Sequence, residues 1–417
     1  MALLAACQGS TTPVPAVPTT IPDLYAAIPG GVSDDTIVLG VSAAFQGPSA
    51  YLGTELYRGA QAYFSYINEN GGVNGRQIKL RMYDDSYNPD PAVKNTATLV
   101  DQDDVFLLFN YVGTPTVTRV LPLLAHYNDR SMYMFFPFTG AEAPRTQPYD
   151  EMTFNLRASY RQEIAGLVDN LVAAGHSRIA ILYQADSYGR SGWDGAVMAL
   201  AEHDLDIVGE ATYTRGTSFE ASFNEQVEVL KASNPDAILE IGSYQACAGF
   251  IRDARDAGLD MPILNVSFVG TENLLALLQE AGKENQRDYT SNLIISQVVP
   301  YYRETELPAV KEYQTLMIKY NPLPPAGLTA ADYQPLPFSF VSFEGFLNAK
   351  LLVEILEQLG PNPTREQIPE AVESIQNLDL GINTPVSFGP EQHQGSNTVY
   401  YTTVKDNQIV PLEEWYQ

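Results

Sequence analysis

The chain has 417 residues, of which 45% are hydrophobic, and a formal net charge of −26 at pH 7. This length allows two or three domains, each with a core of its own. The acidic balance argues against nucleic acid and anionic membrane surfaces as partners, because both require basic patches. Solubility is the simplest explanation of the charge. No run of about 18 apolar residues occurs, so the sequence predicts no membrane span.

Metal and catalytic motifs are missing from the sequence. The two cysteines and four histidines show no CxxC or HExxH spacing. There is also no GxSxG elbow, no Walker A loop and no GxGxxG after a strand. Cys247 lies in an apolar helical stretch, where a thiol is expected to be inert. The sequence therefore predicts no metal, no cofactor and no catalytic residue.

The first residues resemble a lipidation signal. Leu4-Ala5-Ala6-Cys7 is similar to the bacterial lipobox, in which a cysteine after small residues receives the lipid. The apolar region before it is shorter than a full signal peptide, and an accidental alanine-rich start is the alternative. Residues 8–28 are rich in Thr, Pro and Ala, which is typical of a semi-rigid tether. We therefore expect residues 1–35 to be a signal remnant and tether, lipidated at Cys7.

From Thr36 onward, short apolar strands alternate with amphipathic helices. In the opening unit, Thr54 is the expected N-cap of the helix, Gly71-Gly72 ends it, and Asn74-Gly75 turns the chain into the next strand. Such a βαβ unit predicts a parallel sheet. The expected strands are 37–41, 78–82, 105–109, 132–136, 179–183, 237–241, 263–266 and 292–299. The expected helices are 54–70, 93–100, 163–174, 193–202, 219–231, 272–281, 341–359 and 364–375, with others after 116 and before 257.

The strands and helices form two series of similar size, divided near 154–157. Residues 320–337 are proline-rich and are expected to form a long loop. The tail, at 398–404 and 408–411, is typical of a hairpin. Longer loops follow the strands, and in open parallel sheets ligands bind at the carboxyl ends of strands.

Two such loops in the first series carry hydroxyl groups. Gly113-Thr114-Pro115-Thr116 opens a helix, whose unpaired N–H groups and partial positive charge suit a carboxylate. Gly113 would let the backbone approach a ligand closely. Phe138-Thr139-Gly140 offers a second set of donors. The alternative is that Thr114 only caps its helix.

The second series places aromatic residues at matching positions. Tyr188, Tyr244 and Phe268 each follow a strand, where a ring can clamp a small organic ligand. The alternative is a packed lobe surface, since the chain has 25 tyrosines. Asp84-Asp85 ends a strand of the first series, and a solvated strand end is favoured there over the alternative, a role in ligand binding or in a hinge.

Several blocks of the sequence occur together in one known family. They are Gly47-Pro48, Gly53, Gly59-Ala60, Ile67-Asn68, Gly71-Gly72-Val73-Asn74-Gly75-Arg76, Tyr83-Asp84-Asp85, Gly113-Thr114-Pro115-Thr116, Phe154-Asn155-Leu156-Arg157, Asp186-Ser187-Tyr188-Gly189 and Ala254-Arg255-Asp256-Ala257-Gly258. From Thr36 onward the chain resembles the branched-chain amino-acid-type, or type I, periplasmic substrate-binding proteins of ABC importers.

This resemblance implies an α/β fold with two Rossmann-like lobes, whose mainly parallel sheets are joined by a three-segment hinge. Lobe 1 would comprise 36–156 and 298–395, and lobe 2 would comprise 157–297 and 396–417. In members of the family that bind amino acids, Thr114 and Thr139 match positions that hold the ligand carboxylate. Tyr188 and Tyr244 match tyrosines of the second lobe.

The chain departs from the family pattern at two positions. Ser267-Phe268-Val269-Gly270 stands where an acidic residue helps to hold the ligand ammonium, and Glu272, a turn into the next helix, is the candidate to replace that acid. Leu52 stands where a tyrosine is expected, with Tyr51 beside it. Both departures argue against a plain aliphatic amino acid as the ligand.

The resemblance implies an extracytoplasmic solute-binding component of an ABC importer, located in the periplasm or at the cell surface. Its partners would be permease subunits and a small ligand, either an amino acid or a related carboxylate. The alternative is a sensory protein of the same fold that binds an aromatic acid, amide or urea-like ligand and signals to a receptor. An enzyme is disfavoured, because no nucleophile or metal motif is present.

Overall fold

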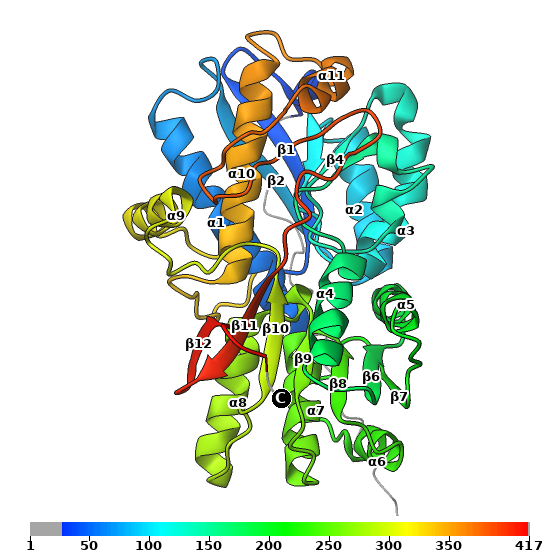
Figure 1. The fold of residues 1–417 in the computed structure, drawn as a ribbon. Helices are drawn as coiled ribbons and strands as arrows, with labels where there is room; N and C mark the ends of the chain where they lie inside the picture. The colour runs from blue at the N-terminus through cyan, green and yellow to red at the C-terminus, as the bar shows by residue number, and fades with distance from the viewer. Residues whose placement is uncertain (1–26, 416–417) are drawn as a thin grey trace, which may run out of the picture.

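Two mainly parallel sheets, one above the other in Figure 1, form the framework of the molecule. A computed structural model describes residues 27–415, so Cys7 and most of the predicted tether lie outside the described residues. We call the part around the five-stranded sheet lobe 1 and the part around the seven-stranded sheet lobe 2. The lobe boundaries expected from the sequence stay a prediction.

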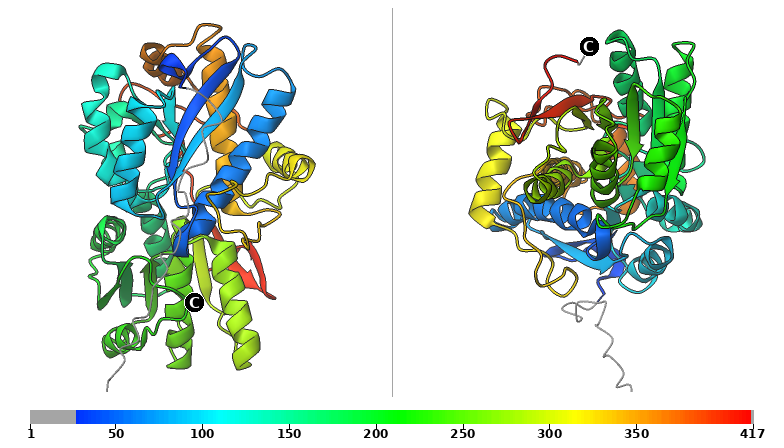
Figure 2. Two further views of the ribbon diagram at one scale, coloured as in Figure 1. Left: turned by 180° about the vertical axis from the view of Figure 1, so that it is seen from behind. Right: turned by 90° about the horizontal axis from the view of Figure 1, so that it is seen from below.

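The strands of lobe 1 all run parallel. They lie in the order β2 (Gln77–Asp84), β1 (Thr36–Ala43), β3 (Leu107–Phe109), β4 (Met134–Phe135) and β5 (Thr153–Phe154). The helices are α1 (Ala50–Glu69), α2 (Pro89–Asp101), α3 (Thr114–His126), α9 (Pro308–Tyr320), α10 (Phe340–Gln358) and α11 (Ile368–Glu373). Helices α1 and α10 cover one face of the sheet, and α2 and α3 cover the other (Figure 2).

The sheet of lobe 2 ends in an antiparallel hairpin. Its order is β12 (Gln408–Pro411), β11 (Tyr400–Lys405), β10 (Leu293–Gln297), β9 (Ile263–Asn265), β8 (Ala237–Ile241), β6 (Ile179–Gln184) and β7 (Glu210–Tyr213). The helices are α4 (Tyr160–Ala173), α5 (Ser187–Ala201), α6 (Asn224–Ala232), α7 (Tyr244–Asp256) and α8 (Thr271–Asn285). Strand β11 pairs antiparallel with β10 and β12, which confirms the predicted hairpin.

The opening βαβ unit is present, but its helix starts earlier than expected. A 3₁₀ turn at Gly47–Ser49 leads directly into α1, and Ser49 occupies the N-cap position. The prediction that Thr54 caps this helix is therefore wrong, because Thr54 lies buried inside it. The predicted tight turn is confirmed, since both Asn74 (φ 50°) and Gly75 (φ 83°) are left-handed.

Two glycines let α1 and α10 approach backbone to backbone. A Cβ on Gly59 would lie 1.7 Å from the carbonyl oxygen of Ser342, and one on Gly345 would lie 2.0 Å from that of Leu56. Only glycine fits these positions, because real Cβ atoms do not come so close to another atom. This contact fixes α10 against lobe 1 and so positions the residues that α10 presents to lobe 2.

The chain crosses between the lobes three times. It passes from β5 to α4, returns from β10 to α9 and α10, and passes again from α11 to β11. In Figure 1 these crossings lie together between the two sheets. Within residues 27–415, no helix combines the length and the apolar character needed to cross a membrane.

Candidate ligand-binding site

Two buried threonine hydroxyls face each other at the carboxyl ends of β3 and β4. Thr114 Oγ1 and Thr139 Oγ1 lie 2.6 Å apart, and neither residue is exposed. Thr114 is the first residue of α3, while Gly113 is the N-cap, and no side chain caps the helix. The alternative that Thr114 merely caps α3 is therefore wrong. Its hydroxyl is held beside that of Thr139 at a helix N-terminus, where an anion is favoured.

Aromatic rings lie against the two glycines of these loops. A Cβ on Gly113 would lie 2.1 Å from the ring of Tyr87, and one on Gly140 would lie 2.5 Å from the ring of Tyr160. That the backbone at Gly113 approaches a ligand stays a prediction. The glycine accommodates Tyr87, which the sequence analysis did not select.

Phe268 lies at the centre of an aromatic cluster that joins the lobes. Its ring centroid is 4.7 Å from that of Tyr188, 5.4 Å from that of Phe138 and 5.8 Å from that of Tyr87. Tyr188 in turn contacts Tyr160 at 5.2 Å. Phe138 and Tyr87 come from lobe 1, whereas Phe268 and Tyr188 come from lobe 2, so these buried rings meet where the two lobes touch, a place that we call the interlobe cleft.

A buried arginine lies beside this cluster. The guanidinium of Arg157 lies 4.7 Å from the centre of the Phe138 ring, and its Nη2 donates to Ser267 Oγ and, at 3.5 Å, to Glu163 Oε1. Its Nη1 is 3.4 Å from Glu344 Oε1, within ion-pair distance but without hydrogen-bond geometry. Its Nε has no hydrogen-bond partner among the described residues. Arg157 therefore retains donor capacity inside the cleft.

Burial shifts the pKa values of Arg157 and of its partner Glu344. Burial lowers the pKa of Arg157, but Glu344 and Glu163 outweigh this effect, so the pKa is raised. Burial raises the pKa of Glu344 to about 7, although Arg157 acts in the opposite direction. Arg157 therefore stays charged at neutral pH, whereas Glu344 is partly protonated.

Tyr160 provides a second buried donor. It is the first residue of α4, it is fully buried, and its Oη has no hydrogen-bond partner among residues 27–415. Burial raises its pKa, while Arg157 and the nearby Thr114 lower it. Most buried polar groups are paired, so an unpaired phenol beside two threonine hydroxyls is a candidate ligand contact.

Tyr51 and Tyr244 form a neighbouring group around Glu272. Tyr51 Oη donates to Glu272 Oε2 at 2.8 Å, and the backbone N–H of Phe340 donates to Glu272 Oε1 at 2.9 Å. The rings of Tyr51 and Tyr244 pack edge to face at 5.6 Å. Glu272 therefore joins lobe 2 to the N-terminus of α10. Because both of its carboxylate oxygens are already bonded within the protein, the structure does not support the hypothesis that Glu272 holds a ligand ammonium.

The prediction for Asp84-Asp85 is wrong in part. Asp85 is buried and accepts hydrogen bonds from Ser42 Oγ at 2.8 Å and from the backbone N–H of Tyr87 at 2.9 Å. Burial raises its pKa to about 7. Asp85 is therefore not a solvated strand end. It holds the backbone that places Tyr87 in the cleft.

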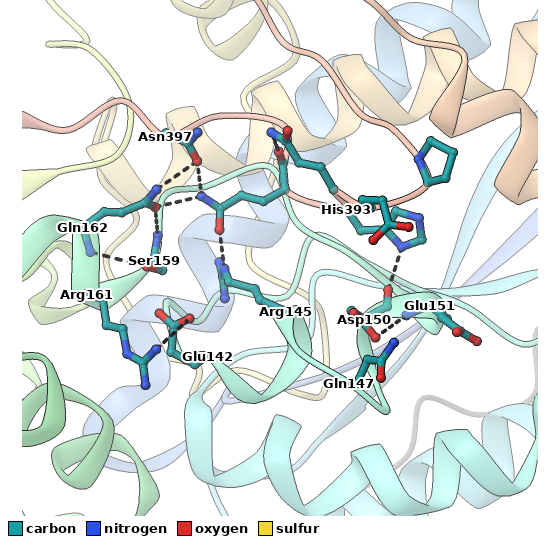
Figure 3. A pocket seen from close by; sticks show the side chains of 14 residues that line it. Glu142, Arg145, Gln147, Asp150, Glu151, Ser159, Arg161, Gln162, His393 and Asn397 are labelled. Carbon is teal, nitrogen blue, oxygen red and sulfur yellow. Dashed lines mark hydrogen bonds and ion pairs between the residues drawn. The ribbon is translucent and has the colours of Figure 1, made fainter.

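A cavity lined mainly by polar and charged side chains lies on the hinge side (Figure 3). Its volume is about 530 Å³, and none of the nine site residues predicted from the sequence lines it. Gln394 is its hub, bonded to Arg145 Nε at 2.7 Å, to Gln162 Oε1 at 2.7 Å and to Asn397 Oδ1 at 2.5 Å. These bonds tie two chain crossings together, so the cavity has the character of a hinge support.

Comparison with known proteins assigns the family. A family model described as periplasmic binding protein matches residues 36–408. The chain belongs to this family. The match confirms the resemblance proposed from the sequence, and it confirms that the chain is a binding protein and not an enzyme. Among residues 27–415, no group of three His, Cys, Asp or Glu side chains could hold a metal ion.

Solved structures of this family share the fold along nearly the whole chain. A possible leucine/isoleucine/valine-binding protein from Rhodopirellula baltica is 31% identical, with 93% of this chain and 98% of that chain covered and a TM-score of 0.79. A substrate-binding periplasmic protein from Ralstonia solanacearum is 28% identical, with 90% and 100% covered and a TM-score of 0.79. These matches confirm the predicted two-lobed α/β fold.

A curated relative is similar over a shorter stretch. An amino acid binding protein of Pseudomonas aeruginosa is 27% identical over 243 residues, which cover 57% of this chain. The match spans 62% of that relative's own length.

The nine predicted site residues of this periplasmic binding protein fall into two neighbouring groups. Gly270 connects them, because a Cβ there would lie 3.0 Å from the ring of Tyr51. The first group is Gly113, Thr114, Phe138, Thr139, Gly140, Tyr188 and Phe268, and the second is Tyr51 and Tyr244. Sequence reasoning missed Tyr87, Arg157, Tyr160 and Glu163. Arg157 was within a matched block, but its position in the cleft depends on the packing of both lobes.

Proposed function

We propose that the protein is the extracytoplasmic solute-binding component of an ABC importer, whose lobes close over an amino acid or a related small carboxylate. The observation that carries the proposal is the buried pair Thr114 and Thr139 at the N-terminus of α3, facing aromatic rings of both lobes. Hydroxyl and helix N-terminal N–H groups suit a carboxylate, and rings suit an apolar body.

The relatives support the class of ligand. The names of the Rhodopirellula baltica and Pseudomonas aeruginosa proteins refer to leucine, isoleucine and valine and to amino acids, respectively. Permease subunits of an importer would be the protein partners, and the periplasm or cell surface would be the location. We propose Cys7 as the site of a lipid anchor.

A thermal-shift screen tests the proposed function. Amino acids, aromatic acids and small amides are added to the purified protein, and a ligand at 100 times its Kd should stabilise it by about 2.7 kcal/mol. The Thr114→Val/Thr139→Val variant is the control, and a roughly 30-fold weaker Kd should reduce its stabilisation to about 0.9 kcal/mol. If no small solute stabilises the protein, the binding role is contradicted.

Cell fractionation tests the anchor separately. Replacing Cys7 by Ser should release the protein from the membrane fraction, because the lipid is attached through the cysteine thiol. A Cys7→Ser variant that remains with the membrane would contradict lipidation at this residue without affecting the binding proposal.

A further inference from the structure

We infer that the interlobe cleft takes a carboxylate without an ammonium group, attached to an apolar or aromatic body. This inference rests on the proposed function and narrows its ligand class. It follows from a surplus of hydrogen-bond donors in the cleft, from the lack of a free carboxylate there, and from the position of one positive charge.

The donors without partners are buried and lie together. Tyr160 Oη and Arg157 Nε have no hydrogen-bond partner among the described residues, and these residues are 0% and 3% exposed. Thr114 Oγ1 and Thr139 Oγ1 are bonded to each other. A buried donor without an acceptor is unfavourable. A ligand that brings carboxylate oxygens would satisfy these groups, whereas a ligand that brings only donors would not.

The carboxylates beside the cleft are already used. Glu163 accepts from the backbone N–H of Ser267 at 2.8 Å, from Ser267 Oγ at 3.0 Å and from Ser296 Oγ at 2.7 Å. Both oxygens of Glu272 are bonded across the lobes. Glu344 forms an ion pair with Arg157. An ammonium in this cleft would therefore lose water without gaining a free carboxylate, which is costly.

Aromatic faces can also hold a cation, but two rings of this cluster already have one. The guanidinium of Arg157 lies 4.7 Å from the centre of the Phe138 ring, and that of Arg215 lies 5.9 Å from the centre of the Tyr87 ring. A further positive charge in the same cleft would be repelled by both arginines. The rings of Tyr188 and Phe268 are therefore suited to an apolar or aromatic body.

Matched ligand pairs test this inference by isothermal titration calorimetry on the full chain. The pairs are 3-phenylpropanoate with phenylalanine and 4-methylpentanoate with leucine, which differ only in the ammonium group. We expect the acid without the ammonium to bind at least about tenfold more tightly in one pair or both. Equal or tighter binding of the amino acids would overturn the inference and leave the proposed function standing.

Failure of the proposed function would look different. In that case none of these four compounds binds, and no solute in the thermal-shift screen stabilises the protein. If a stronger ligand emerges from that screen, the presence of an ammonium on it overturns the inference, and a carboxylate without one supports it.

Variants at Tyr160 and Phe268 test whether these residues determine which class of ligand binds. Tyr160→Phe should weaken binding of the favoured acid about tenfold, yet leave the free protein equally or more stable, because it removes an unpaired buried hydroxyl. A merely structural Tyr160 would lose stability and leave affinity unchanged, which would remove it from the site. Phe268→Glu should shift preference towards the amino acid of each pair, whereas Phe268→Gln, the uncharged control, should not. If Phe268→Glu does not fold, the ligand pairs and Tyr160→Phe still decide.

Discussion

The hinge cavity and the interlobe cleft differ in which polar groups stay unpaired. In the hinge cavity, Gln394 is bonded to Arg145, Gln162 and Asn397, and the unpaired group is an acceptor, Glu142 Oε1. In the cleft, Tyr160 Oη and Arg157 Nε are buried without a partner. Paired networks make structure rigid, whereas unpaired buried groups call for an explanation. The balance of unpaired hydrogen-bond donors and acceptors is therefore a better guide to binding chemistry than the volume of a cavity.

Two buried arginines, Arg145 at the hinge cavity and Arg157 at the cleft, also differ in their bonding partners. Arg145 donates to the carbonyl oxygens of Ala141, Thr139 and Arg157 and to Gln394 Oε1. Burial, together with Arg157, lowers its pKa to about 10. Arg157 has carboxylate partners instead, and neither its Nε nor its Nη1 has a hydrogen-bond partner among the described residues. Arg145 thus holds the hinge backbone by hydrogen bonds to carbonyl oxygens. Arg157 instead neutralises buried carboxylates beside the cleft.

Replacing these two arginines should produce the largest effects. Arg157→Met leaves Glu163 and Glu344 buried without their cation, and we expect the free energy of unfolding to fall by about 3–5 kcal/mol. Arg145→Met is the matched variant and should lose less, because the acceptors it leaves are neutral. Urea denaturation of both variants measures the difference in the free energy of unfolding. An equal loss in the two variants would contradict the distinction between the two arginines.

The pH dependence of stability tests the charge state of the cleft. The pKa of Glu344 is about 7 in the folded protein, above its ordinary value of roughly 4.3 in an unfolded chain. A raised pKa means that this group contributes stability below about pH 4, which is lost as the pH rises through 7. Glu344→Gln should remove that loss, of up to about 4 kcal/mol. Parallel pH profiles of unfolding for both proteins would contradict the raised pKa.

The threonine pair should dominate the affinity for a carboxylate. Thr114→Val together with Thr139→Val should weaken binding by about 2 kcal/mol, or roughly 30-fold, from the lost hydrogen bonds. The hydroxyl pair itself becomes apolar together, but the backbone N–H of Ala141 loses its acceptor on Thr139, so stability should fall by about 1 kcal/mol. Thr118→Val is the control, since its hydroxyl mainly bonds the carbonyl of Thr114 within α3. Calorimetry that shows unchanged affinity for the double variant would remove this pair from the site.

The contact between Tyr51 and Glu272 should have a smaller effect, through closure of the lobes. Tyr51→Phe removes one charge-assisted hydrogen bond but leaves Glu272 bonded to Phe340, so we expect affinity to fall about tenfold, or ~1.4 kcal/mol. Glu272→Gln should cost less, since an amide oxygen still accepts. Small-angle scattering should show more open molecules for Tyr51→Phe, and an unchanged profile with unchanged affinity would contradict this role.

The smallest effect on binding is expected at the hinge. Gln394→Ala removes the hub of the hinge cavity, so stability should fall by about 1 kcal/mol. Affinity should stay within about twofold, because no cleft residue loses a partner. A drop in affinity comparable with that of the threonine variant would contradict the distinction between the hinge cavity and the interlobe cleft.

The fold could be predicted largely from local patterns. Alternating strands and helices, the Asn74-Gly75 turn and the hairpin at the C-terminal end are short-range features, and each is present. Four helix starts, those of α1, α2, α4 and α5, were placed three to six residues too late. Ser159 and Gln162 form a capping box that begins α4 at Tyr160, three residues before the predicted start. The sequence analysis also left out β7 and α9, whose patterns are weaker.

The site could be predicted only in part, for a physical reason. Thr114, Thr139 and the rings that follow strands are placed by the sheet itself, so strand order brings them to one edge. Arg157 and Tyr160 gain their role from the burial of both lobes around a hinge segment. No local pattern encodes which of their donors stays unpaired, because that depends on residues more than a hundred positions away, such as Ser267 and Glu344.

The bonds of Glu272 to Tyr51 and Phe340 have a kinetic consequence. They are formed by protein groups alone, so they favour the shut form before any solute arrives. A solute can enter only while the lobes are apart, and the observed association rate is therefore the intrinsic rate multiplied by the fraction of time spent open. The same bonds slow release once a solute is inside. Glu272 would thus lengthen the residence time of a captured molecule at the expense of the speed of capture.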